Sequence, residues 1–279
     1  MSINIDYLTK VFFYFDEPVP YKVEDGKFIE IKPVTLRNSE IFLTSADILT
    51  VDKNSYADVN IIQMSYLQFL IKVLIANDNS NPINELNRQK FVNILILCLG
   101  LKFPMIEWID ENTPCIVDKE LEIKITPKQF DDIRKIIMYQ NIVHYDDDYI
   151  NPEFKKAMME EDELRNRNKV VPSLERKMAI ITAHSGLSKK EQQEMTYRSH
   201  CILFDEVCGE VEFTTVRPIS LLGGKDEMEH WIFKNQKGKF DDYMRSVDSY
   251  SKSMGGGSAI RTADSNIGDE YMALYDKFK

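Results

Sequence analysis

Residues 61–76, IIQMSYLQFLIKVLIA, form the most apolar stretch of this 279-residue chain. Gln63, Gln68 and Lys72 interrupt the stretch, and it is shorter than the roughly 20 apolar residues that a helix needs to cross a bilayer. It therefore predicts a buried helix over residues 55–77 and no membrane partner. A helix that is apolar on most of its sides must be covered by other elements, so we expect it at the centre of a core.

A second apolar helix is predicted directly afterwards, over residues 82–100. Asn81 supplies an N-cap, and Pro82 takes the first helical position, where its missing N–H costs nothing. The apolar residues of this helix are Phe91, Ile94, Leu95, Leu97 and Cys98. We expect the two helices to form an antiparallel pair that is the core of the amino-terminal half of the chain.

Two small β-hairpins are predicted around this helical pair. In residues 20–34, the dipeptide Asp25-Gly26 suits a tight turn between two alternating segments. The run KVFFYF, residues 10–15, is predicted as a strand beside it. A second hairpin is expected around residues 115–125. The sequence therefore predicts an α+β fold that is mostly α-helical, with one or two small β-hairpins near the N-terminus and around 115–125.

The second half of the chain is predicted to be helical. Thr126 and Gln129 fit a capping box with Pro127 at the first helical position, and this helix is expected to end near Asn141. Further helices are expected over residues 38–50, 152–168, 173–184 and 188–208, and a short amphipathic piece over 103–110. The apolar face of the helix over 188–208 is expected to be made of Tyr197, Cys201, Phe204 and Cys208.

We expect the chain to be divided into three parts. Residues 1–125 are predicted as a domain of β-hairpin and helical pair, residues 126–222 as a helical domain, and residues 223–279 as a flexible tail rich in Ser and Gly. The end of the tail carries apolar residues spaced as on one face of a short helix. We predict that this face binds a partner through Tyr271, Leu274, Tyr275 and Phe278.

The composition and the absence of known motifs argue against a catalytic or metal-binding protein. The formal net charge of −10 disfavours phosphate binding across the whole surface. The sequence has no GxSxG, GxxxxGK[ST] or GxGxxG motif. The acidic run from His144 to Asp148 lacks calcium-loop spacing. His184, His200, Cys201 and Cys208 lack the short paired spacing of zinc ligands. We therefore predict no catalytic residues, no metal site and no cofactor, and keep an enzyme with an unrecognised site as an alternative.

The four cysteines form no CxxC pair. The apolar run over residues 11–15 is too short for the core of a signal peptide and precedes no small-residue cleavage site, so we expect no export signal. Without export, the cysteines are predicted to be reduced and mostly packed. Cys98, within NILILCLGL, is expected to lie in the core.

Residues 173–200 suggest a second function class. Two predicted helices flank a turn that contains glycine, which is the outline of a helix-turn-helix. The second helix would offer Lys189, Lys190 and Arg198 to nucleic acid. Two glutamates in the same span, and the acidity of the whole chain, oppose binding to phosphate. A nucleic-acid-binding regulator is therefore the alternative function, with nucleic acid not expected as a partner in the main hypothesis.

Four segments together resemble tail-gene products of tailed phages of low-GC Gram-positive bacteria. They are ITPKQFDDIRKIIMYQN (125–141), NPEFKKAMMEEDELRNRN (151–168), AHSGLSKKEQQEMTYRSHCILFDEV (183–207) and EHWIFKNQKGKFDDY (229–243). The amino-terminal hairpin also looks like the start of such proteins. These proteins are usually called tail assembly chaperones, or tail and baseplate components.

The resemblance implies a function in protein binding that involves no catalysis. Such a protein binds other phage tail proteins, for example an aggregation-prone tape measure, or holds a place in the tail as a baseplate or tail component. It would work in the host cytoplasm during assembly, or in the virion tail, and could form a homo-oligomer. The resemblance carries over no catalytic residues, so we expect a non-enzymatic tail morphogenesis protein that acts by protein–protein contacts.

Overall fold

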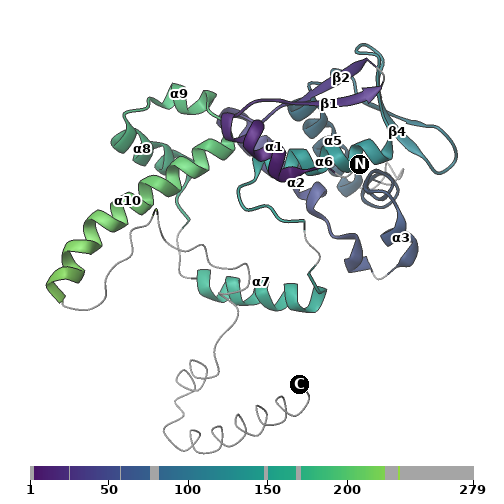
Figure 1. Cartoon of the computed structure of the whole chain (residues 1–279). Coiled ribbons are helices and arrows are strands. Elements are labelled where there is room, and N and C mark those ends of the chain that lie inside the picture. The colour runs from purple at the N-terminus through teal and green to yellow at the C-terminus, as the bar shows by residue number, and fades with distance from the viewer. Residues whose placement is uncertain are drawn as a thin grey trace, which may run out of the picture. The chain divides into compact units, whose positions relative to one another are not determined.

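The computed structural model describes residues 3–24, 26–56, 58–75, 82–147, 150–167, 171–223 and Ile232. The described chain is mostly α-helical, with one two-stranded and one three-stranded antiparallel sheet (Figure 1). The predicted α+β fold is therefore confirmed. Contacts group the chain into two compact units, Met1–Lys225 and Asp226–Lys279. The predicted partner-binding residues of the tail, Tyr271, Leu274, Tyr275 and Phe278, lie outside the described residues.

The elements follow one another closely along the chain. The α-helices are α1 Ile5–Val11, α2 Ser39–Thr50, α3 Val59–Gln63, α4 Tyr66–Phe69, α5 Pro82–Leu99, α6 Pro127–Asn141, α7 Pro152–Asn166, α8 Leu174–Ser185, α9 Lys189–Glu194 and α10 Tyr197–Gly223. The strands are β1 Val19–Glu24, β2 Lys27–Ile31, β3 Met105–Trp108, β4 Pro114–Asp118 and β5 Ile123–Ile125. Three short 3-10 helices are η1 Phe13–Phe15, η2 Leu36–Asn38 and η3 Lys53–Tyr56, and η4 Leu70–Ile75 is a π-helix. None of the described helices is both long and apolar enough to span a bilayer.

Both predicted hairpins are present. β1 pairs with β2 and places Tyr21 opposite Ile29. Gly26 in their turn has a φ of 79°, which a residue with a Cβ rarely adopts. β4 pairs with β5, and β3 extends this second sheet along the other side of β4, giving the order β3-β4-β5. The predicted amphipathic piece over 103–110 thus contains an edge strand.

The predicted strand over residues 10–15 is wrong. This segment contains the end of α1 and the short turn η1. Asn4 caps α1 by accepting a hydrogen bond from the Tyr7 N–H at 3.0 Å, so a helix is already nucleated before the aromatic run begins. Phe13, the first residue of η1, is buried in the core. Its side chain is therefore removed from water without any strand pairing.

The long helix predicted over residues 55–77 is wrong in its continuity and in its cap. Asp58, not Ser55, caps α3, and Ser65 opens α4 through a capping box with Gln68. The chain then continues as the π-helix η4. Lys53 donates to the Ile62 carbonyl at 3.3 Å and to the Met64 carbonyl, so it satisfies backbone oxygens at the break between α3 and α4.

One hydrophobic core contains residues from both sides of the predicted boundary at 125/126. α5 is confirmed, and Leu70 from η4 and Leu95 from α5 are both buried in this core. α6, which opens the predicted second domain, contributes Phe130, Ile133, Ile136 and Ile137 to the same core. The β1–β2 hairpin packs on α5 and α6, as Figure 1 shows. The predicted boundary at 125/126 therefore falls inside one compact unit, because α6 has no separate core of its own.

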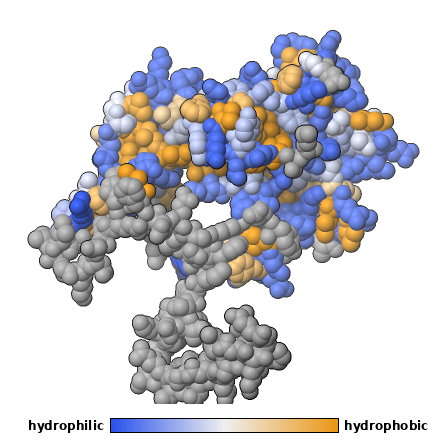
Figure 2. Space-filling view, in the orientation of Figure 1, coloured by the Kyte–Doolittle hydropathy of each residue, from blue (hydrophilic) through white to orange (hydrophobic). Residues whose placement is uncertain are grey.

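The helices of the second half follow their predicted signals. Thr126 and Gln129 form the expected capping box, and α6 ends at Asn141. Asn151 caps α7, whose residues 153–166 are all exposed or half-buried. Gly186, with a φ of 75°, ends α8 in the left-handed conformation. Hydrophilic residues cover much of the described surface in this view, with apolar patches between them (Figure 2).

The single helix predicted over residues 188–208 is wrong, because the chain leaves the helix at Met195 and Thr196. There the Leu36 N–H donates to the Met195 carbonyl at 2.8 Å, and the Tyr197 N–H donates to the Val34 carbonyl at 2.8 Å. This pairing replaces helical hydrogen bonds and separates α9 from α10. The expected apolar face is also shifted: Cys208 is exposed, while the buried residues of α10 between 197 and 218 are His200, Val207 and Phe213.

Candidate functional site

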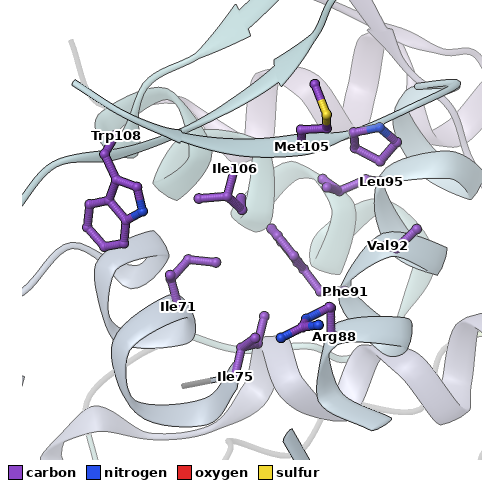
Figure 3. A pocket seen from close by; sticks show the side chains of 10 residues that line it. Ile71, Ile75, Arg88, Phe91, Val92, Leu95, Met105, Ile106 and Trp108 are labelled. Atoms are coloured by element: carbon purple, nitrogen blue, oxygen red, sulfur yellow. The ribbon is translucent and has the colours of Figure 1, made fainter. Parts of the chain in front are cut away.

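An apolar groove lies between the π-helix η4, the helix α5 and the edge strand β3. Its volume is about 330 Å³. Figure 3 shows side chains from all three elements around the hollow. The lining residues are Ile71, Ile75, Arg88, Phe91, Val92, Leu95, Pro104, Met105, Ile106 and Trp108. Nine of these ten residues are apolar, so the groove suits an apolar side chain from a binding partner.

The floor of the groove belongs to the rigid core. Phe91 is 2% exposed and Leu95 is 1% exposed. The Phe91 ring meets the Phe130 ring of α6 edge-to-face, with centroids 5.7 Å apart. Because the floor is fixed by core packing, a ligand in the groove would meet a preformed surface.

The wall made by β3 is exposed to solvent. Trp108 is 43% exposed and Met105 is exposed to the same degree. Ile106 and Trp108 point toward the hollow, whereas Met105 points away from it (Figure 3). Phe103 and Ile109, which flank β3, are also exposed. Exposed aromatic and methionine side chains beside a groove are typical of protein-binding surfaces.

Two cations flank the groove. Arg88 lines it and forms an ion pair with Glu85 at 3.2 Å. Lys72 Nζ lies 5.8 Å from the centroid of the Trp108 ring and donates to Asn112 Oδ1 at 2.7 Å. The described lining residues include no acidic side chain. Lys72 also interacts electrostatically with Asp110, so the groove is apolar and the charges at its rim are paired.

Asp118 fixes the loops on both sides of β3 and β4. Its buried carboxylate accepts hydrogen bonds from the backbone N–H groups of Lys102 and Phe103, at 2.7 and 3.0 Å. It also accepts from the N–H groups of Glu120 and Leu121, at 3.0 and 3.2 Å. Burial tends to raise the pKa of this carboxyl, but the four N–H donors outweigh it, so the pKa lies below its usual range.

A second, polar pocket has a volume of about 520 Å³ and contains several titratable groups. The groups are Lys53, Tyr66, Lys128, Asp131, Asp132, Arg134 and Lys135. Such a gathering is a typical starting point for an active-site hypothesis. The hydrogen bonds of these groups decide whether they are available for chemistry.

The groups at the centre of the polar pocket are used to hold the fold. Arg134 donates from Nε to the Leu49 carbonyl at 2.7 Å, and its guanidinium lies 4.0 Å from the centroid of the Tyr66 ring. Asp131 accepts from the Tyr66 N–H at 2.9 Å, while burial raises the pKa of its carboxyl. Burial also raises the pKa of Tyr66, to about 12. We interpret this pocket as a structural junction between α6 and the chain around α4.

The His, Cys and acidic residues that the sequence analysis considered and discounted as metal ligands are not gathered into a metal-binding group among the described residues. Within the described ranges, no group of three His, Cys, Asp or Glu side chains is arranged to hold a metal ion. Asp147, from the acidic run, pairs with Lys135 at 3.3 Å. Burial raises the pKa of all four cysteine thiols, that of Cys98 to about 12. Thiols with raised pKa values are protonated at neutral pH and are poor nucleophiles.

The helix-turn-helix outline exists, but it does not present its predicted cations together. Arg198 donates from Nη1 to the Tyr139 carbonyl at 3.0 Å and is half-buried. Lys189 lies 3.9 Å from Glu175. The would-be recognition helix α9 has only six residues and packs on η2. A recognition helix needs a free face that is long enough to lie in the major groove of DNA, and the face of the six-residue α9 is short.

No family model, no curated protein and no solved structure matches this chain. The apolar groove is therefore the feature of the described structure that bears most directly on function. Sequence reasoning missed this site, because its residues come from three segments whose packing no local pattern reveals. The available signal was the segment FPMIEWID, in which a tryptophan and a methionine lie close together in a short strand.

Proposed function

We propose that this protein is a non-enzymatic morphogenesis protein of a phage tail, which binds another tail protein in its apolar groove. An assembly chaperone for a protein such as the tape measure is the preferred form of the proposal, and a tail or baseplate component is its alternative. The phage context rests on the sequence resemblance. The observation that supports partner binding is the groove, with exposed Trp108 on its wall.

The composition of the groove favours a protein partner over a small molecule. Small-molecule sites combine an apolar lining with several precisely placed polar groups. Here Arg88 is the one charged lining residue of the described set, and it already pairs with Glu85. A partner's side chain needs only an apolar cavity and a polar rim.

A chaperone role would follow from the same surface. A long tail protein exposes apolar segments before it assembles, and such segments aggregate. A preformed apolar groove could cover one segment and release it when the tail tube offers a better surface. In this proposal the protein acts in the host cytoplasm during assembly; the alternative component would remain in the virion.

Affinity purification from infected cells tests the proposal. The wild-type chain should recover a tail protein that mass spectrometry identifies, and Trp108→Ala should not. Phe28→Ala is the matched control, because Phe28 is an exposed aromatic residue of β2 outside the groove. Presence in purified virions would indicate the component form, and absence would indicate the chaperone form. Failure of the wild type to recover any tail protein would contradict the proposal.

A further inference from the structure

β3 presents an open strand edge beside the groove. It is the terminal strand of the order β3-β4-β5, and among the described residues its one strand neighbour is β4. An edge of this kind carries backbone groups that a further strand can pair with. β3 contains one charged residue, Glu107, which pairs with Lys119 at 3.2 Å.

The register shows which backbone groups face outward. The Ile109 N–H donates to the Thr113 carbonyl at 2.9 Å, and Trp108 is opposite Pro114, which has no N–H. Hydrogen-bonded and non-hydrogen-bonded pairs alternate in an antiparallel ladder. Glu107 therefore pairs inward with β4, and the N–H and C=O groups of Ile106 and Trp108 face the open edge.

The packing beneath this sheet is incomplete at the same edge. In β4, Cys115, Ile116 and Asp118 are buried. In β3, Met105, Glu107 and Trp108 are exposed, and the groove lies between this strand and the helices η4 and α5. A neighbouring strand would run about 4.8 Å from β3. Its side chains on the groove side would reach the hollow that β3 leaves unfilled.

We infer that the groove binds an extended segment of a partner protein, which pairs with β3 as a fourth strand. One apolar side chain of the segment enters the hollow beside Ile106 and Trp108. The inference rests on the proposed function, because it specifies how the tail partner would bind. The main-chain bonds supply affinity and the hollow supplies selectivity, as in other cases of strand addition.

The charges around the hollow define the chemistry of the segment further. Arg88 pairs with Glu85, and Lys72 interacts electrostatically with Asp110, so each cation beside the hollow already has a carboxylate close by. The lining itself is apolar apart from Arg88. A charged side chain would lose its hydration there without a compensating partner, so the segment is an extended stretch that places an uncharged apolar side chain in the hollow.

Synthetic peptides test this inference with the full-length protein. The probes are peptides of about eight residues, a usual strand length, in which leucine or valine alternates with threonine. In a matched peptide, the central apolar residue is replaced by Asp. Two further versions of the unsubstituted peptide carry N-methyl groups on alternate amides, one on the odd positions and one on the even positions. Binding is measured by titration and by amide hydrogen exchange of the protein.

Strand pairing predicts a specific pattern of results. The unsubstituted peptide binds, and the Asp-substituted peptide binds at least about fivefold more weakly. One of the N-methylated versions loses binding while the other keeps it, because only alternate amides face β3. The amides of Ile106 and Trp108 become protected from exchange, whereas the Ile109 amide, already bonded to Thr113, changes little.

Two results would overturn the inference. Equal binding of both N-methylated versions would mean that side chains alone are bound. No binding by any of the peptides, or no protection at Ile106 and Trp108, would exclude strand addition. Either result would leave the proposed function standing if Trp108→Ala still abolished recovery of a tail protein, so the two failures are distinguishable.

Discussion

Lys72 of the π-helix and Trp108 of the edge strand meet across the groove, with the ammonium 5.8 Å from the ring centroid. In the sequence, Lys72 interrupts the most apolar stretch and so argues against a membrane span. In the structure, it lies beside the exposed wall of the apolar groove, and Asn112 holds it at 2.7 Å. A cation near an indole is a modest attraction, about 0.5–1 kcal/mol at an exposed site.

The core is expected to depend on η4 and α5. Leu70→Ala or Leu95→Ala should lower the free energy of unfolding by about 2–5 kcal/mol, because each removes side-chain atoms that are almost completely buried. Denaturant unfolding measures the change. Leu164→Ala on the exposed α7 is the control and should cost less than about 0.5 kcal/mol. A similarly small loss at both core positions would show that the two leucines are not buried.

The buried carboxylate of Asp118 should make the free energy of unfolding depend on pH in the acidic range. Its pKa is lowered in the folded state, so its contribution is fully present above its unfolded pKa, about 3.9. The contribution is lost as the pH falls through the folded pKa. Asp118→Asn should therefore be less stable than wild type at pH 7, with a smaller difference near pH 2.

Unfolding curves between pH 2 and pH 7 check this prediction for Asp118. The exposed Glu111→Gln is the control and should follow the wild-type profile. A stability difference between wild type and Asp118→Asn that grows toward low pH would contradict a lowered pKa of Asp118 in the folded state.

Metal removal should have no effect on stability. The described residues hold no grouped metal ligands, so a bound ion is not expected to stabilise the folded state. Dialysis against a chelator, followed by thermal unfolding, measures this. A thermal midpoint that falls by several degrees after dialysis, and recovers on adding zinc or calcium, would revive the His/Cys or acidic-run site.

The sequence predicted the elements that carry strong local signals. Gly26, Thr126 and Gly186 mark a turn, a helix start and a helix end, because each meets a requirement of the backbone next to it. The interruptions at Ser65 and Thr196 were missed. At Thr196 the reason is a hydrogen bond to distant residues around Val34, which no window along the chain contains.

The groove could not be predicted for the same reason. Its residues come from η4, α5 and β3, and only the packing of a small sheet over two helices brings them together. The apolar character of residues 61–76 indicated burial. The pattern does not distinguish Leu70, which faces the core, from Ile71, which also lines the groove.

The tail is predicted to dock on a partner and not to support the described fold. Deletion of residues 246–279 should reduce recovery of the partner while the thermal midpoint stays within about two degrees of wild type, because an isolated short helix is marginal in water. Tyr271→Ala combined with Phe278→Ala in the full chain is the finer variant. A fall of many degrees in the thermal midpoint on deletion would mean that the tail packs against the rest of the chain and contributes to its stability.

The most direct test of partner binding is a titration of the recovered tail protein with wild type, Trp108→Ala and Phe28→Ala. Truncation of a central aromatic anchor usually costs about 2 kcal/mol or more. Trp108→Ala should therefore weaken binding at least about tenfold. Its thermal midpoint should change little, since Trp108 is 43% exposed, and Phe28→Ala should bind as wild type does. Equal affinity of Trp108→Ala and wild type would contradict the account, because the groove would then not be where the partner binds.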